Sequence, residues 1–143
     1  LSLPDALPIS SPHLVTFGER IPLGDYDQDS RRDIVTLAHR IQSEIGLLYK
    51  VLPTALVAAA VRPQHTRGEL AARIDAMLGP LRDMGANLAV KDGRQAAEQG
   101  VEALIERGVL VSARQHLRVR DRIVLKYYAR TIEHLLSATR TTH

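Results

Sequence analysis

The sequence predicts a mainly α-helical fold of four or five helices with one small β-hairpin, plus a single strand near the N-terminus. In several long segments, apolar residues recur at intervals of three and four, which is the spacing of a helix that buries one side. Near the end of the chain, two short segments, Val109–Val111 and His116–Val119, are predicted as strands and are close enough to pair as a hairpin. A third run, at 13–18, is partly β-branched and predicts the lone strand.

The first two helices have local start and stop signals. Ser30 is an N-cap candidate, and the apolar pattern that follows it continues to Leu48. Pro53 ends that helix, because the residue before a proline disfavours the helical conformation. Residues 54–61 then form a short helix that is apolar on nearly every side, so we expect it to be buried.

Two more helices follow before the hairpin. Thr66 and Glu69 have the spacing of a capping box and open a helix that we expect to end at Gly85. Pro80 lies inside this pattern and is a potential kink. A further helix over 95–107 is expected to end at Gly108.

The final helix, predicted over 122–136 with Asp121 as its N-cap, is expected to anchor the core. It carries two of the four tyrosines in a chain that has one Phe and no Trp. Aromatic rings bury large areas, so this helix is the natural centre of packing. The predicted core joins it to the other helices through Ile41, Ile45, Leu56, Leu78, Leu104, Leu125, Tyr128 and Ile132.

Four parts are predicted along the chain. The sequence of residues 1–11 resembles the translation of a sequencing adapter, and we interpret these residues as a non-native, disordered leader. Residues 12–29 are interpreted as a terminal strand and loop of a domain that lies upstream. Residues 30–138 form the helical domain, and the tail at 139–143 is expected to fray.

Composition excludes several classes of site. There is no cysteine, which rules out disulfides and thiolate metal ligands. The six histidines show no metal-ligand spacing, so we expect neither a metal nor a cofactor. The longest apolar run, at 51–61, is far shorter than the about 20 residues that a membrane-spanning helix needs.

One short string has the form of a catalytic motif. His116 and Asp121 match His-x4-Asp, in which an aspartate orients a general-base histidine. Here the histidine opens a predicted strand and the aspartate caps the next helix, so we interpret the match as chance. The sequence therefore predicts no catalytic residue.

The order of helix, hairpin and helix is also that of a winged helix, which raises nucleic-acid binding as an alternative. Arginines in and after the hairpin would then contact phosphates, namely Arg114, Arg118, Arg120 and Arg122. Against this, Glu98, Glu102 and Glu106 form an acidic line on the helix that would have to enter the groove. Nucleic acid is therefore not favoured, and a helical protein-interaction domain stays open as another alternative.

The final helix carries one candidate binding feature. Arg122, Lys126 and Arg130 are spaced four apart and form a basic line in a direction different from the apolar stripe. We interpret this line as a candidate contact for an anionic membrane surface, with a plain solvated face as the alternative.

Four short segments of the sequence resemble, in the same order, segments of the C-terminal part of the bacterial glycerol-3-phosphate acyltransferases. They lie at 13–21, 52–60, 103–110 and 125–136. The second contains Thr54-Ala55-Leu56-Val57, and the last has a Tyr-Tyr pair before Ile132, His134 and Leu135.

The resemblance implies phospholipid synthesis at the cytoplasmic face of the membrane, by acyl transfer from acyl-CoA or acyl carrier protein to glycerol 3-phosphate. It implies that the catalytic motifs lie upstream of 13–21, so no catalytic residue is carried over to this chain. We therefore expect an inactive C-terminal fragment, with the missing acyltransferase domain as its partner in cis.

Overall fold

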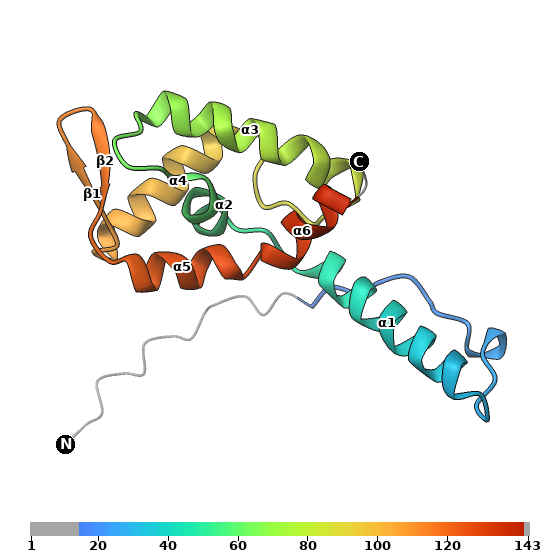
Figure 1. Ribbon diagram of the computed structural model, residues 1–143. Coiled ribbons are helices and arrows are strands. Elements are labelled where there is room, and N and C mark those ends of the chain that lie inside the picture. The colour runs from blue at the N-terminus through green and yellow to red at the C-terminus, as the bar shows by residue number, and fades with distance from the viewer. Residues whose placement is uncertain (1–14, 142–143) are drawn as a thin grey trace, which may run out of the picture.

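The computed structural model describes residues 15–141 and is mainly helical, with one two-stranded antiparallel hairpin, as the sequence predicts (Figure 1). Within these residues there are six α-helices and a short 3-10 helix, η1. Their bounds are η1 Leu23–Asp25, α1 Arg31–Leu48, α2 Pro53–Ala60, α3 Arg67–Asp83, α4 Gly93–Glu106, β1 Leu110–Ala113, β2 His116–Val119, α5 Arg122–Arg130 and α6 Glu133–Thr141.

Helix α2 is the centre of the body, and α3, α4 and α5 pack around it (Figure 1). Six of its eight residues are buried, which confirms the expectation of a short buried helix. Alanine and valine make α2 thin, so its neighbours come close from several sides. One close approach is at Gly100 of α4, which lies against the first turn of α2.

The core is built from aliphatic side chains of α2, α3, α4 and the hairpin, together with Ile132 just before α6 and Leu135 within it. Of the predicted core residues, Leu56, Leu78, Leu104 and Ile132 are fully buried. Leu125 and Tyr128 are half-buried and pack against this cluster. These six positions therefore belong to one core.

Helix α1 is the main departure from the expected packing. It projects from the body as an arm, and none of its residues is buried (Figure 1). Ile41 and Ile45, predicted as core, are 39% and 63% exposed. The reason is that α2 to α6 complete a core among themselves. Periodicity shows which side of a helix is apolar, but not whether the fold supplies a partner for it.

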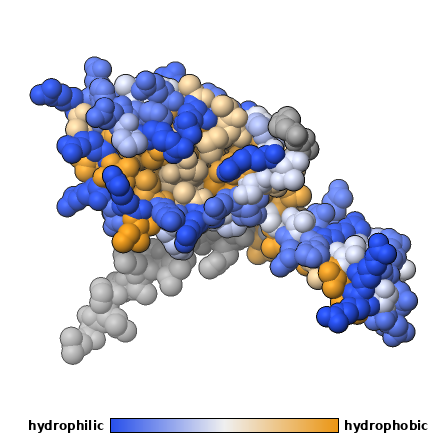
Figure 2. Space-filling model, in the orientation of Figure 1, coloured by the Kyte–Doolittle hydropathy of each residue, from blue (hydrophilic) through white to orange (hydrophobic). Residues whose placement is uncertain are grey.

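The arm joins the body close to the last turn of α1. The Gly46 carbonyl oxygen lies 3.3 Å from His134 Nε2, and the Asn87 side-chain amide donates to the Leu48 carbonyl at 3.2 Å. The rings of Tyr49 and His134 meet edge to face. Figure 2 shows that apolar side chains of the arm reach the molecular surface among hydrophilic ones.

The single final helix predicted over 122–136 is in fact two helices. It breaks after Arg130, where the Thr131 hydroxyl donates to the Tyr128 carbonyl at 2.6 Å. A threonine hydroxyl that bonds to the backbone competes with helical hydrogen bonding. The break turns Ile132 and Leu135 into the body, and both are buried. Helix α5 itself has no buried residue, so α2 and not α5 anchors the core.

The last helix also extends further than expected. Helix α6 continues to Thr141, through part of the segment that we expected to fray. In this helix the Thr139 hydroxyl donates to the Leu136 carbonyl at 2.8 Å, and the Thr141 hydroxyl donates to the Ser137 carbonyl at 3.2 Å.

The hairpin forms as predicted, with Leu110 opposite Val119 and Ala113 opposite His116. Its turn contains neither Gly nor Asn, and Arg114 adopts a left-handed φ of 57° instead.

The strand expected at 13–18 is absent from its described part, since residues 15–18 are not in a strand. Residues 13 and 14 lie outside the described residues, as does the predicted leader. A strand needs a partner for its hydrogen bonds, and in residues 15–141 the two hairpin strands pair with each other, with one further bridge from His116 to Thr66. Instead, the segment before α1 lies along that helix: the Arg40 guanidinium donates to the Tyr26 hydroxyl at 3.1 Å.

Candidate anionic-surface site on helix α5

Helix α5 is fixed at its start by Asp121. One carboxylate oxygen of this residue accepts hydrogen bonds from the backbone N–H groups of Ile123 and Val124, both at 3.0 Å. The cap was predicted from the sequence and is confirmed. On the inner side of the helix, Leu125 and Tyr128 pack against the core. This orientation decides which residues face outward.

The outward side carries the basic line, formed by Arg122, Lys126 and Arg130. All three side chains are exposed. Within residues 15–141, none of them makes an ion pair or a hydrogen bond to another side chain. In particular, the acidic line of α4 does not neutralise them. The three cations are therefore free to attract an external anion.

Two apolar side chains lie beside the basic line. Ile123 is 85% exposed and Tyr127 is 69% exposed, and each follows a basic residue by one position. Figure 2 shows apolar side chains between hydrophilic ones along the lower edge of the body, where α5 lies. The outer side of α5 therefore combines cations with exposed apolar groups, as helices that lie on membrane surfaces do.

Neither residue was predicted as part of the candidate site. Only Tyr128 was named in the predicted core, and Tyr127 was counted with it as part of the helix expected to anchor the core, because aromatic rings bury large areas. The structure separates them: Tyr128 faces inward, where its hydroxyl accepts a hydrogen bond from the Arg107 guanidinium at 3.2 Å. Tyr127 faces outward, although the two rings touch edge to face. The spacing of four between Ile123 and Tyr127 was the signal that places them on one outer line.

The two residues of the His-x4-Asp string do not pair with each other in this fold. His116 is at the start of β2 and bridges to Thr66. The Asp121 carboxylate accepts from the first N–H groups of α5. Each residue therefore has a structural position of its own.

Of the four arginines considered for a winged helix, two are brought to one groove, Arg118 and Arg122. Arg120 lies at a separate hollow on the hairpin. Glu98, Glu102 and Glu106 are all exposed on α4. The exposed side of the helix that would enter a duplex is therefore acidic.

In the part of the chain that the structure describes, no three His, Asp or Glu side chains gather closely enough to hold a metal ion. Across the same residues, no helix has both the length and the apolar character to cross a membrane. No protein-family model, curated protein or solved structure matches this chain. The candidate site is therefore interpreted from its own residues.

Proposed function

We propose that this chain is the C-terminal helical region of a glycerol-3-phosphate acyltransferase, and that it holds the enzyme against an anionic membrane surface. Two lines support the proposal. The first is that four short segments between residues 13 and 136 resemble segments of that family and follow one another in the same order. The second is the outer side of α5, where the unpaired basic line runs beside Ile123 and Tyr127. This second observation carries the docking role.

The acyl transfer itself is assigned to the upstream acyltransferase domain, the proposed partner in cis. That domain would transfer the acyl group from acyl-CoA or acyl carrier protein to glycerol 3-phosphate, at the cytoplasmic face of the membrane. This chain, as given, is proposed to be inactive, because the family's His-x4-Asp motif would lie before residue 13. His116 and Asp121 are engaged in the strand bridge and the helix cap described above.

The proposed docking is weak and reversible. A basic residue near an anionic bilayer contributes about 1 kcal/mol, and the attraction fades beyond a Debye length, about 10 Å at about 0.1 M salt. Three such residues favour a salt-sensitive association. Ile123 and Tyr127 would add the burial of apolar area, and tyrosine is enriched at membrane–water interfaces. The arrangement supports adsorption on the surface and not insertion across it.

The experiment is vesicle flotation of the full chain with phosphatidylglycerol vesicles and with phosphatidylcholine vesicles across a salt series. We expect binding to the anionic vesicles at low salt only. Changing Arg122, Lys126 and Arg130 together to Gln should reduce this binding to the level seen with phosphatidylcholine. Equal flotation of this triple variant and the wild type at every salt concentration would remove the membrane role.

A matched control removes the same charge from elsewhere. Arg67 and Arg73 of α3 and Arg94 of α4 are exposed, and α3 lies across the body from α5 (Figure 1). Their triple Gln variant should float like the wild type. If it loses binding as fully as the α5 variant, net charge and not the α5 face is responsible.

The two alternatives receive less support. The exposed acidic line of α4 would repel a duplex, which disfavours a winged-helix nucleic-acid module. A helical protein-interaction domain is favoured by the exposed isoleucines of α1, but it leaves the pairing of cations with Ile123 and Tyr127 on α5 unexplained.

A further inference from the structure

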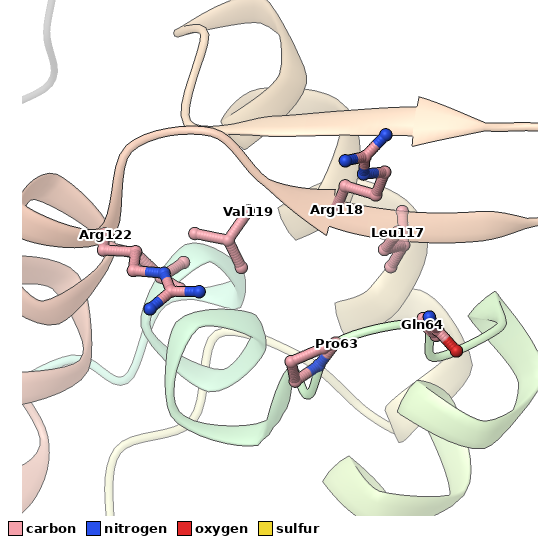
Figure 3. Close-up of a pocket in the computed structure, with 7 residues that line it drawn as sticks. Pro63, Gln64, Leu117, Arg118, Val119 and Arg122 are labelled. Atoms are coloured by element: carbon pink, nitrogen blue, oxygen red, sulfur yellow. The ribbon is translucent and has the colours of Figure 1, made fainter.

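A groove of about 510 Å³ opens between the turn that joins α2 to α3, strand β2 and the first turns of α5 (Figure 3). The segments that form it are far apart in the sequence. Pro63 and Gln64 border it on the side of the turn, and Leu125 borders it from α5. The volume is within the range of about 300–1,000 Å³ that is usual for small-molecule sites.

One wall of the groove is apolar. Leu117 is fully buried, and Val119, two residues further along β2, is half-buried. Residues two apart in a strand point to the same side, so both lie on the groove side of β2, with Leu117 buried beneath the surface and Val119 partly exposed. Pro63 stands across from them (Figure 3). A ligand that entered here would therefore meet aliphatic groups along much of its length.

Two arginines border the groove, Arg118 of β2 and Arg122 of α5. Figure 3 shows the Arg122 guanidinium extending over the groove beneath Val119, while Arg118 leaves the other side of the strand and lies over the hairpin. Both side chains are exposed, and within residues 15–141 neither has a hydrogen-bond partner. Since Arg118 has no partner to lose, turning it towards the mouth costs mainly side-chain entropy.

No acidic group balances these charges inside the groove. None of the seven described residues that line it is Asp or Glu. Asp121, the carboxylate nearest to Arg122 along the chain, accepts from backbone N–H groups of α5 and makes no ion pair with that arginine. The groove therefore combines an apolar wall with the Arg122 guanidinium over it and Arg118 at its border, and no described lining residue offsets their charge.

We propose that this groove binds a phosphate monoester that carries an apolar chain, with Arg122 and a reoriented Arg118 on the phosphate and with Pro63, Val119 and Leu125 along the chain. A phosphate monoester has three terminal oxygens and close to two negative charges. It can therefore accept hydrogen bonds from two guanidinium groups, for which a ligand carboxylate has fewer oxygens and less charge. This proposal does not rest on the proposed function, because it concerns a monomeric ligand and not a vesicle surface.

The test titrates the full chain with soluble, monomeric probes and follows its amide NMR signals. The probes are inorganic phosphate, dihexanoyl phosphatidic acid below its micelle concentration, and dihexanoyl phosphatidylcholine. We expect dihexanoyl phosphatidic acid to shift signals over residues 117–125 and to bind more tightly than the other two. Equal affinity for inorganic phosphate would assign the site to free phosphate and overturn the role of the apolar wall. Equal affinity for phosphatidylcholine would overturn the role of the monoester.

Two single variants separate the groove from the basic line. Arg118 lines the groove and is not on the basic line, whereas Lys126 is on the basic line and does not line the groove. Arg118→Gln should weaken the binding of dihexanoyl phosphatidic acid by roughly tenfold or more, the usual cost of one charge-assisted hydrogen bond. Lys126→Gln should leave it unchanged. Equal losses in the two variants would overturn the groove as a defined site and leave only general attraction by charge.

Discussion

Gly100 of α4 lies directly against the carbonyl group of Pro53 at the first turn of α2. A side-chain carbon placed on Gly100 would stand 2.5 Å from that carbonyl oxygen and 2.6 Å from a methyl group of Val57. Both distances are below van der Waals contact. The two helices can therefore pack at this separation only while position 100 has no side chain.

Gly100→Ala is expected to destabilise the fold. Overpacking a tight contact typically costs about 1–3 kcal/mol, which exceeds the about 1 kcal/mol that alanine gains over glycine inside a helix. Urea unfolding followed by circular dichroism measures the difference. The matched control is Gly79→Ala in α3, where a new side-chain carbon meets nothing within 4 Å. That variant should be as stable as the wild type or more stable, and equal effects at the two positions would contradict the tight contact.

Leu56→Ala is expected to lower the free energy of unfolding by about 2–5 kcal/mol, because it leaves a cavity in the middle of α2. Leu56 is fully buried, whereas Ile45 on the arm is mostly exposed. Ile45→Ala should therefore change the unfolding free energy by less than about 0.5 kcal/mol. Thermal and urea unfolding of both variants provide the comparison. A large loss for Ile45→Ala would mean that α1 is packed in solution.

The free energy of unfolding should depend on pH through Glu69. Its carboxylate accepts hydrogen bonds from the Thr66 backbone N–H at 2.8 Å and from the Thr66 hydroxyl at 2.9 Å, which lowers the pKa of Glu69. Because the folded pKa is below the unfolded one, this stabilisation is complete above the unfolded pKa and is lost as the pH falls through the folded pKa.

The measurement is urea unfolding from about pH 7 down to about pH 3. Glu69→Gln should be less stable than the wild type at neutral pH and should converge with it in acid. Glu102→Gln is the control, because within residues 15–141 the Glu102 carboxylate makes no hydrogen bond. A constant difference between Glu69→Gln and the wild type at every pH would contradict the role of the ionised capping box.

Asp121→Ala is expected to cost about 0.5–2 kcal/mol, since it removes the acceptor for two N–H groups at the start of α5. Asp121→Asn should restore most of that loss, because asparagine is also a good N-cap. Chemical unfolding of the two variants tests this. If Asn were as damaging as Ala, the charge of Asp121 and not its cap would be needed.

The elements that could be predicted are those with local causes. Ser30, Thr66 and Asp121 each cap a helix through hydrogen bonds within three residues, so the sequence around them is sufficient. Helix α2 was predicted as buried because it has no polar side to expose. The break at Thr131 could not be predicted in the same way, since a threonine hydroxyl bonds to the helix backbone only in some settings.

The two candidate sites also differ in how far the sequence predicts them. The exposure of the basic line could be predicted, because helical spacing places these residues on a different side of the helix from Leu125 and Tyr128. The groove could not be predicted, because Pro63, Arg118 and Arg122 come from three separate segments that only the fold brings to one place. Residue type was also misleading for Tyr127, which the structure places on the outside.

The projecting helix α1 has a mechanical consequence. It contains 18 residues, so at 1.5 Å per residue it is about 27 Å long. The contacts with His134 and Asn87 involve only Gly46, Leu48 and Tyr49, at or just beyond its last turn. The helix is therefore a lever pivoted at one end: a rotation of about 10° at the pivot would displace the Arg31 end by about 5 Å. Any rotation at this junction would thus become a larger movement at the far end of the arm.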